Sequence, residues 1–407
     1  MIEHRNRSRY LTAGEAVTIL GVSRASLYAY VSRGRIHAEA DPRDPRSSRY
    51  LAADVERLRD RKQARLHPEI AVRKSLNWGV PVLESGISLI EAGRLYYRGH
   101  DALALARRGR FDEVVRLLWG WKAGHELPSA PESLAVHKAI PRLGSLPVME
   151  RLQAILPLAA AADPAALDVS PENVSTTGWR ILSLLTAAVT LQAPGSPSLV
   201  AASLADGWKV RTRPGRRLLE MALILCADHE LNVSAFAARV VASTGSSPYD
   251  VVGAGLGALR GPRHGGYTAR IETFLDESGS PAGVRRVLAA RLRRGESAPG
   301  FGHPLYPDGD PRARLLFEEI ERAWPDSKAT AFLRASRAAG HALLDESPNV
   351  DFGLVILRRA LGLTRGSALV LFALGRTVGW IAHAIEQYAE EQLIRPRASY
   401  TGPPPRA

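Results

Sequence analysis

The chain has 407 residues, 45% of them apolar and 23% charged, as expected of a globular protein long enough for two or three domains and a sizeable core. One cysteine, Cys226, excludes an intramolecular disulfide, and the absence of both a roughly 20-residue apolar run and a hydrophobic signal core predicts a cytoplasmic protein with no membrane contact. The net charge of +13 is compatible with a nucleic-acid partner, but only six of the 54 basic residues are lysines, and charge alone does not decide the function.

Residues 11–62 predict a small module of two short helices joined by a glycine turn. Thr12 and Ser23 are placed to cap helices over 13–20 and 24–32. The elements expected after them are strands near 36–38 and 49–51 and a helix over 52–61. This order resembles the winged helix-turn-helix domains of the MerR-like and excisionase type, so we predict such a domain over residues 1–66.

A domain of this kind predicts contact with DNA. Residues 1–66 hold 14 Lys and Arg against 8 Asp and Glu, so a sixth of the chain carries nearly half of the net charge. The side chains expected in the major groove are Ser23, Arg24, Ser26 and Tyr30, and those expected on phosphates are Arg43, Arg46 and Arg49. The alternative is a module that serves only as a packing or dimer-contact element.

Residues 67–84 read as a linker, and from residue 85 onward the pattern is almost wholly helical. Short strands are expected over 85–98, followed by a helix capped by Gly99-His100-Asp101. Further helices are expected over 112–119, 147–162, 176–191, 216–231, 234–243, 248–259, 282–293, 312–323, 329–344, 352–363 and 367–391. Many are apolar on most faces, which predicts burial between other helices or at a subunit contact. We therefore predict an all-α body.

Three loops between these helices carry side chains suited to chemistry. Residues 299–314, PGFGHPLYPDGDPRAR, set His303 and Arg312 among glycines that allow close approach and prolines that stiffen the chain. The segment GPRHGGY places His264 beside paired glycines, and PNVD places Asp351 at the start of an apolar run. A histidine can donate to a carbonyl oxygen, and an arginine can hold a carboxylate through two hydrogen bonds.

These segments resemble the citrate synthase family. GFGHPLYPDGDPRA is similar to the signature around the family's second catalytic histidine, GPRHGG to the first, PNVDF to the aspartate site, and DHELNVSAFAARVVASTG at 228–245 to its DHE segment. The resemblance covers residues 85–402 in order. It implies a two-lobed helical body, with a large lobe of about 85–269 and 366–402 and a small lobe of about 270–365.

The resemblance implies a role for seven residues. Asp351 would remove a methyl proton of acetyl-CoA, His264 would donate to the thioester oxygen, and His303 would donate to the ketone oxygen of oxaloacetate. The residues expected to bind oxaloacetate are His229, Arg312, Arg376 and Arg395, the last from the neighbouring subunit of a homodimer. No metal and no cofactor beyond the co-substrate acetyl-CoA is expected. His100, His341 and His383 match no role.

Two stretches depart from the family pattern. The family usually has HGGAN where this chain has Tyr267 and Thr268 after the paired glycines, which narrows the acyl side of the site. Pro307 stands where a basic residue often meets the CoA phosphates. Both changes leave the choice of acyl-CoA open.

The resemblance implies condensation of acetyl-CoA with oxaloacetate and water to citrate and CoA, a reaction of the tricarboxylic acid cycle. One alternative is a 2-methylcitrate synthase that uses propionyl-CoA. The other is a DNA-binding regulator in which the helical body senses a ligand or holds a dimer together. Asp351 separates the enzyme from the sensor, because sensing a dicarboxylate requires the arginines and not the base.

Overall fold

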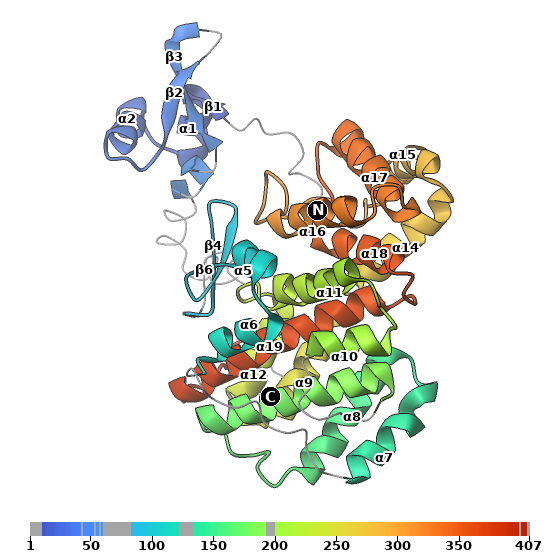
Figure 1. Cartoon of the computed structure of the whole chain (residues 1–407). Helices are drawn as coiled ribbons and strands as arrows, with labels where there is room; N and C mark the ends of the chain where they lie inside the picture. The colour runs from blue at the N-terminus through green and yellow to red at the C-terminus, as the bar shows by residue number, and fades with distance from the viewer. Residues whose placement is uncertain are drawn as a thin grey trace. The chain divides into compact units, whose positions relative to one another are not determined.

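The computed structural model of the chain describes residues 10–41, 44–52, 54–56, 58–59, 83–121, 134–192, 200–398 and 400–404. The chain divides into two units, Met1–Glu84 and Ser85–Ala407, both drawn in Figure 1. Most of the predicted linker, residues 67–82, lies outside the described residues.

The first unit contains the predicted helix pair and a three-stranded antiparallel sheet. Its elements are β1 (Tyr10–Thr12), α1 (Ala13–Leu20), α2 (Arg24–Ser32), β2 (Ala38–Asp41) and β3 (Asp44–Leu51), with the strands in the order β1-β3-β2. The capping box is confirmed, since Thr12 Oγ1 accepts from Glu15 N and the Glu15 carboxylate accepts from Thr12 N at 2.8 Å. Strand β1 was not predicted; it is only three residues long and is held by pairing with β3.

A small core holds this unit together. It consists of Leu11, Ala16, Leu20, Leu27, Ile36, Tyr50 and Val55. Tyr30 packs against this core, whereas Tyr28 is 53% exposed, so the tyrosine that α2 presents to solvent is not the one predicted. Arg49 pairs with Glu39 and its guanidinium lies 4.4 Å from the centre of the Tyr10 ring. Arg43 and the side chain of Arg46 lie outside the described residues.

The second unit is mostly helical, as predicted. It begins with a small antiparallel sheet of β4 (Ser88–Glu91), β5 (Arg94–Tyr97) and β6 (His100–Asp101). The α-helices that follow are α5 (Ala102–Arg108), α6 (Phe111–Trp119), α7 (Leu134–Arg142), α8 (Val148–Ala162), α9 (Pro171–Thr190), α10 (Val200–Gly207), α11 (Arg213–Cys226), α12 (Val233–Ala242), α13 (Pro248–Leu259), α14 (Tyr267–Ser278), α15 (Val284–Arg293), α16 (Pro311–Ala323), α17 (Lys328–Leu344), α18 (Val350–Ala360) and α19 (Ser367–Glu390). Short 3-10 turns, η1 (Leu143–Ser145) and η2 (Pro281–Gly283), precede α8 and α15.

Helix α19 is the central element of this unit. It packs against α6, α9, α11, α12, α13 and α18. Among the described helices it alone is long and apolar enough to cross a membrane, with a mean hydropathy of 1.6, and 89% of that stretch is buried inside the protein. The expectation that no apolar run approaches this length was therefore wrong. Arg376, Thr377 and His383 interrupt the run, so the sequence shows no uninterrupted apolar stretch of this length.

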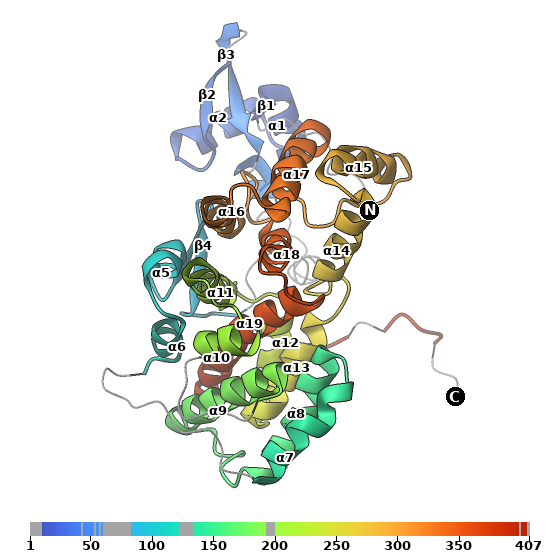
Figure 2. The same ribbon diagram turned by 45° about the vertical axis from the view of Figure 1, so that its right-hand side comes forward.

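Helices α14 to α18 pack on one another and form one end of the second unit (Figures 1 and 2). They meet the rest of the unit mainly where α18 packs against α19 and α16 against α11. The predicted bounds of the two lobes stay a prediction.

Candidate active site

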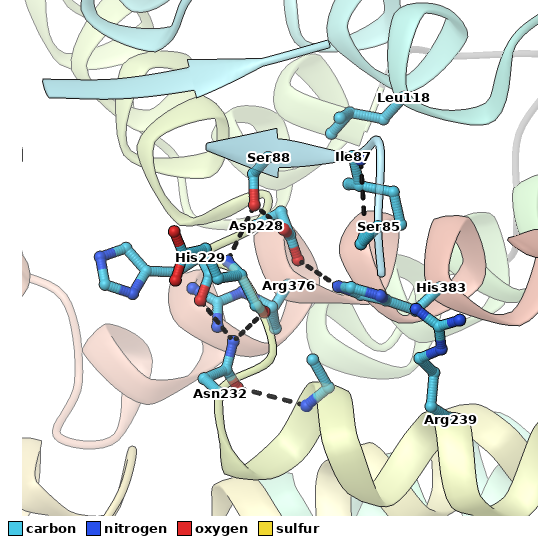
Figure 3. A network of polar contacts seen from close by, with 12 residues as sticks. Ser85, Ile87, Ser88, Leu118, Asp228, His229, Asn232, Arg239, Arg376 and His383 are labelled. Carbon is cyan, nitrogen blue, oxygen red and sulfur yellow. Dashed lines mark hydrogen bonds and ion pairs between the residues drawn. The ribbon is translucent and has the colours of Figure 1, made fainter. Parts of the chain in front are cut away.

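The first part of the site is the turn between α11 and α12. The pattern predicted a helix through residue 231, but α11 ends at Cys226, and Glu230 has a φ of 50°. The turn is bonded on several sides: Ser88 Oγ donates to Asp228 Oδ2 at 2.5 Å, Glu230 N donates to Ser88 Oγ at 2.8 Å and Asn232 Nδ2 donates to His229 O at 3.3 Å (Figure 3). The chain thus leaves the helix early and fixes the backbone of His229.

An Asp-His pair supports this turn from α19. His383 Nε2 lies 3.3 Å from Asp228 Oδ1, and both side chains are fully buried. Burial alone would raise the pKa of Asp228, but the neighbouring His383 ring, with help from Arg376 and Ser88, lowers it. The two backbones approach closely, since Gly379 N donates to Ala227 O at 2.9 Å and a Cβ on Gly379 would lie 2.5 Å from that oxygen.

Sequence reasoning gave Asp228 and His383 no role. The one signal of His383 in the sequence is its spacing, because positions 376, 379 and 383 fall on one face of a helix. Figure 3 shows the ring of His229 on the side of the turn away from His383, so the pair supports the turn without meeting the ring.

The second part of the site is the loop that carries His303, which is bonded to the segment before Asp351. The hydrogen bonds are Gly302 N to Ser347 O at 3.0 Å, Asn349 N to Gly300 O at 2.8 Å and Asn349 Nδ2 to Gly302 O at 3.1 Å. Gly300 and Gly302 have backbone φ values of 80° and 68°, which residues with a Cβ atom rarely adopt. The glycines therefore let the loop pair with this segment and hold His303 and Asp351 on one framework.

Asp310 joins this framework to Arg312. Its carboxylate accepts from Arg312 Nε at 3.0 Å, from Arg312 Nη2 at 2.9 Å and from Val350 N at 3.0 Å. Burial would raise the pKa of Asp310, but the guanidinium beside it outweighs that effect and lowers it. The buried arginine is thus held charged and oriented by a residue that sequence reasoning did not single out.

Three histidines lie around the same space. The ring centres of His229 and His303 are 5.1 Å apart, and His264 Nε2 lies 2.9 Å from Ser234 Oγ. Burial lowers the pKa of His264 to about 4, with Arg376 adding to the shift, and burial and Arg312 lower the pKa of His303 to about 4. Burial, followed by Arg312, also lowers the pKa of His229 well below its ordinary value. All three rings are therefore neutral at pH 7.

The protonated nitrogen of His303 follows from one hydrogen bond. Leu305 N donates to His303 Nδ1 at 3.2 Å, so Nδ1 is the acceptor and a neutral ring carries its proton on Nε2. A neutral imidazole held by backbone is a donor that needs no reorganisation when charge develops on a bound oxygen.

Asp351 and Arg376 have buried atoms that lack a partner among the described residues. Asp351 Oδ1 is one of them. Burial raises the pKa of this carboxyl to about 7; Asp310 adds to this effect, and Arg312 and Arg376 oppose it without cancelling it. Arg376 Nε donates to Cys226 O at 2.8 Å, whereas Arg376 Nη2 has no hydrogen-bond partner among the described residues. A buried guanidinium with an unused donor is costly unless an anion binds there.

Six of the seven predicted residues come together. The pKa of His229 is affected by Arg312, His303, Arg376 and His264, and that of Asp351 by both arginines. The seventh, Arg395, is exposed in the extended segment that leaves α19 (Figure 2). Within one chain the site thus lacks Arg395.

The positions that depart from the family pattern are also described. Tyr267 opens α14, a helix that was not predicted, and the Arg270 guanidinium lies 4.7 Å from the centre of its ring. Thr268 is buried and its hydroxyl donates to Gly265 O at 3.0 Å. Pro307 is exposed.

Fold and site together define a mostly helical protein with two buried arginines, neutral histidine donors and an aspartate, Asp351, of raised pKa. The family described as "Citrate synthase, C-terminal domain" matches residues 75–397, and a "Helix-turn-helix domain" family matches residues 10–63. The chain belongs to the citrate synthase family and carries a helix-turn-helix domain at its N-terminal end.

Relatives and solved structures agree with this assignment. The chain is 32% identical to Citrate synthase 2 of Bacillus subtilis over 363 residues, covering 80% of this chain and 95% of that protein. It is 29% identical to a 2-methylcitrate synthase of Shewanella oneidensis over 359 residues, covering 78% and 91%. Citrate synthase from Thermotoga maritima matches with a TM-score of 0.68 at 30% identity, covering 80% of this chain and 94% of that one. The ternary complex of carboxymethyl coenzyme A and oxaloacetate with citrate synthase from Thermoplasma acidophilum also matches with a TM-score of 0.68, at 26% identity, covering 81% and 96%.

Proposed function

We propose that the protein condenses acetyl-CoA with oxaloacetate and water to give citrate and free CoA. The observation that carries the proposal is the meeting of two neutral histidine donors with an Asp351 oxygen and an Arg376 donor that have no hydrogen-bond partner in the described part of the chain. A site that only sensed a dicarboxylate would need the arginines and would gain nothing from a buried carboxyl beside them.

The reaction follows from these positions. Asp351 takes a proton from the methyl group of the thioester while His264 donates a hydrogen bond to the thioester oxygen, which stabilises the enolate that forms. The methyl-derived carbon then bonds to the ketone carbon of oxaloacetate, and His303 gives its Nε2 proton to the oxygen that was the ketone. Water finally cleaves the new thioester, leaving a carboxylate on citrate and the thiol on CoA.

In this proposal the oxaloacetate dianion is bound by the arginines of the site. Arg312 and Arg376 each keep a charged guanidinium in a buried setting, where a hydrogen bond to a carboxylate is worth roughly 1.5–3 kcal/mol. His229 is a further neutral donor. We assign the remaining contact to Arg395 of the partner subunit, which makes the homodimer the complete enzyme.

Acetyl-CoA is the preferred thioester in this proposal, and propionyl-CoA the alternative. Tyr267 replaces a small residue of the family pattern directly after the glycines that follow His264, and its ring is held by Arg270. A larger side chain there leaves less room for an extra methyl group. Relatives named for either reaction are found at similar identity, so the preference between acetyl-CoA and propionyl-CoA has to be argued from the residues of the site.

The test is thiol release by the purified full-length protein. Oxaloacetate is supplied with acetyl-CoA or propionyl-CoA, and each reaction is repeated without oxaloacetate to measure simple thioester hydrolysis. We expect release that depends on oxaloacetate and is faster with acetyl-CoA. Absence of such release with both thioesters would defeat the proposal, whereas faster release with propionyl-CoA would replace citrate by 2-methylcitrate as the product.

A second function is favoured by the N-terminal unit. Ser23 and Arg24 at the start of α2 are exposed, as is Tyr28, and residues 1–66 carry a net positive charge. We propose that this unit binds DNA through α2. Retention on DNA should weaken steeply with salt and disappear when residues 1–66 are removed; retention that survives removal would contradict it.

A further inference from the structure

Tyr306 lies among three of the residues proposed to bind oxaloacetate, yet neither sequence nor family pattern gave it a role. It is 2% exposed. Its ring centre lies 5.6 Å from that of His229 and 5.0 Å from that of His303, and the Arg312 guanidinium lies 5.5 Å from it. Its one hydrogen bond from the side chain, among the described residues, joins the hydroxyl to His229 Nε2 at 3.0 Å.

The direction of that bond follows from what each group needs. The hydroxyl is buried, and burial raises its pKa to about 12, so it keeps its proton. If it accepted from an Nε2–H, its own proton would have no acceptor among the described residues, and buried donors rarely go unpaired. If it donates to Nε2, its proton is satisfied, and the neutral ring of His229 must carry its proton on Nδ1.

The tautomer of His229 with its proton on Nδ1 also suits an anionic ligand. Nδ1 of His229 has no hydrogen-bond partner among the described residues. A protonated Nδ1 is a donor that attracts a carboxylate, whereas a bare Nδ1 presents a lone pair and repels one. His303 offers the parallel case, since Leu305 N occupies its Nδ1 and leaves the proton on Nε2.

We propose that Tyr306 is a positioning residue for His229: its hydroxyl donates to Nε2, fixes the Nδ1–H tautomer and makes His229 a donor to a dicarboxylate. The inference deepens the proposed function and rests on it for the identity of the ligand. It also links two parts of the site, because Tyr306 stands on the loop of His303 and His229 on the turn after α11.

The first test needs no substrate. The full-length protein is labelled with nitrogen-15 in histidine only, and the His229 signals are identified by their loss in His229→Gln. In the wild type at pH 7.5 we expect His229 to be neutral with a protonated Nδ1, and in Tyr306→Phe we expect the proton to move toward Nε2. The His303 signals, with Nε2 protonated, should stay unchanged and serve as the control for an intact site.

Two results of this test would overturn the inference. One is a wild-type His229 with its proton on Nε2. The other is a Tyr306→Phe variant whose His229 tautomer is unchanged. The wild-type spectrum alone decides the first point, so the inference remains testable if the variant does not fold.

The second test separates positioning from packing by calorimetric titration with oxaloacetate. Tyr306→Phe should raise the Kd about tenfold, the size of a typical lost hydrogen bond, with little change in kcat. In a His229→Gln background the same substitution should change the Kd by less than about twofold, because there is no imidazole left to orient. Equal losses in both backgrounds would mean that Tyr306 acts through packing and would overturn the inference. A wild type that does not bind oxaloacetate would defeat the proposed function, and the tautomer measurement would still decide the role of Tyr306.

Discussion

The two units of the chain differ in how many charged side chains they bury. In the described part of the N-terminal unit, Asp54 is the single buried charged residue, and it accepts from His37 N at 2.8 Å. In the helical body, several charged residues are buried, and four of them, Asp228, Asp310, Arg312 and Arg376, gather where α11, α16, α18 and α19 meet. A surface charge can attract a charged partner over a distance, whereas a buried charge can act on a bound molecule at close range.

Buried charge alone does not mark a working site. Arg239 is fully buried in the same unit, but its guanidinium is bonded to Gln387 Oε1 at 2.9 Å and Glu390 Oε1 at 2.6 Å and lies 3.5 Å from Glu386. Within the described residues, by contrast, Arg376 Nη2 and Asp351 Oδ1 have no hydrogen-bond partner. Arg376 therefore differs from Arg239 in keeping a buried donor, close to Asp351, that a bound anion can accept from.

The largest expected effect is that of Asp351→Asn. This change keeps the shape of the side chain and removes the base, so kcat should fall about 10²- to 10⁴-fold while oxaloacetate still binds. Thiol release measures the first quantity and calorimetry the second. A variant that keeps more than a tenth of the wild-type kcat would show that another group takes the proton.

A smaller effect is expected for Arg376→Met. Loss of charged hydrogen bonds to a carboxylate should raise the KM for oxaloacetate about 10- to 100-fold. The matched control is Arg260→Met, which removes an exposed arginine that pairs with Glu150. If both variants gave the same KM, the distinction between buried and surface arginines would fail.

The dependence on pH should follow the base. With its pKa raised to about 7, Asp351 is protonated and inactive below that pH and ionised above it, so kcat/KM should rise about tenfold per pH unit below 7 and level off above it. The histidines with a pKa of about 4 do not titrate in this range. Measuring kcat/KM from pH 5.5 to 8.5 tests for this rise. A level profile would contradict a raised pKa at the base.

The smallest effect is expected from removing residues 1–66. Because the groups proposed for catalysis all belong to the helical body, kcat and KM should stay within about twofold of the full chain. The same truncation should abolish DNA retention. A large loss of kcat would mean that the helical body needs the N-terminal unit for catalysis.

Local features could be predicted from the sequence, and long-range partners could not. The caps at Thr12 and Ser23 depend on residues three positions away, and the loops around His264, His303 and Asp351 stand out by composition. Asp228 and His383 lie 155 positions apart, and His229 and Tyr306 are 77 apart. Nothing within one segment shows which residue will stand beside another after folding.

The predicted end of a helix was wrong where a turn of the candidate site interrupts an apolar pattern. The run ending in MALILCADHEL continues in period past Cys226, yet the chain turns there because Ser88 and His383 bind Asp228. Conversely, no helix was expected between residues 259 and 282, yet α14 begins directly after the paired glycines, at Tyr267. In both places tertiary contacts outweigh local preference.

The most direct test of the central claim is a crystal structure of the protein with oxaloacetate and an unreactive acetyl-CoA analogue bound. The account predicts the ketone oxygen within hydrogen-bond reach of His303 Nε2, a carboxylate on Arg376 and the acyl carbon next to Asp351. Oxaloacetate bound elsewhere, or bound with Asp351 and Arg376 still unpartnered, would contradict it.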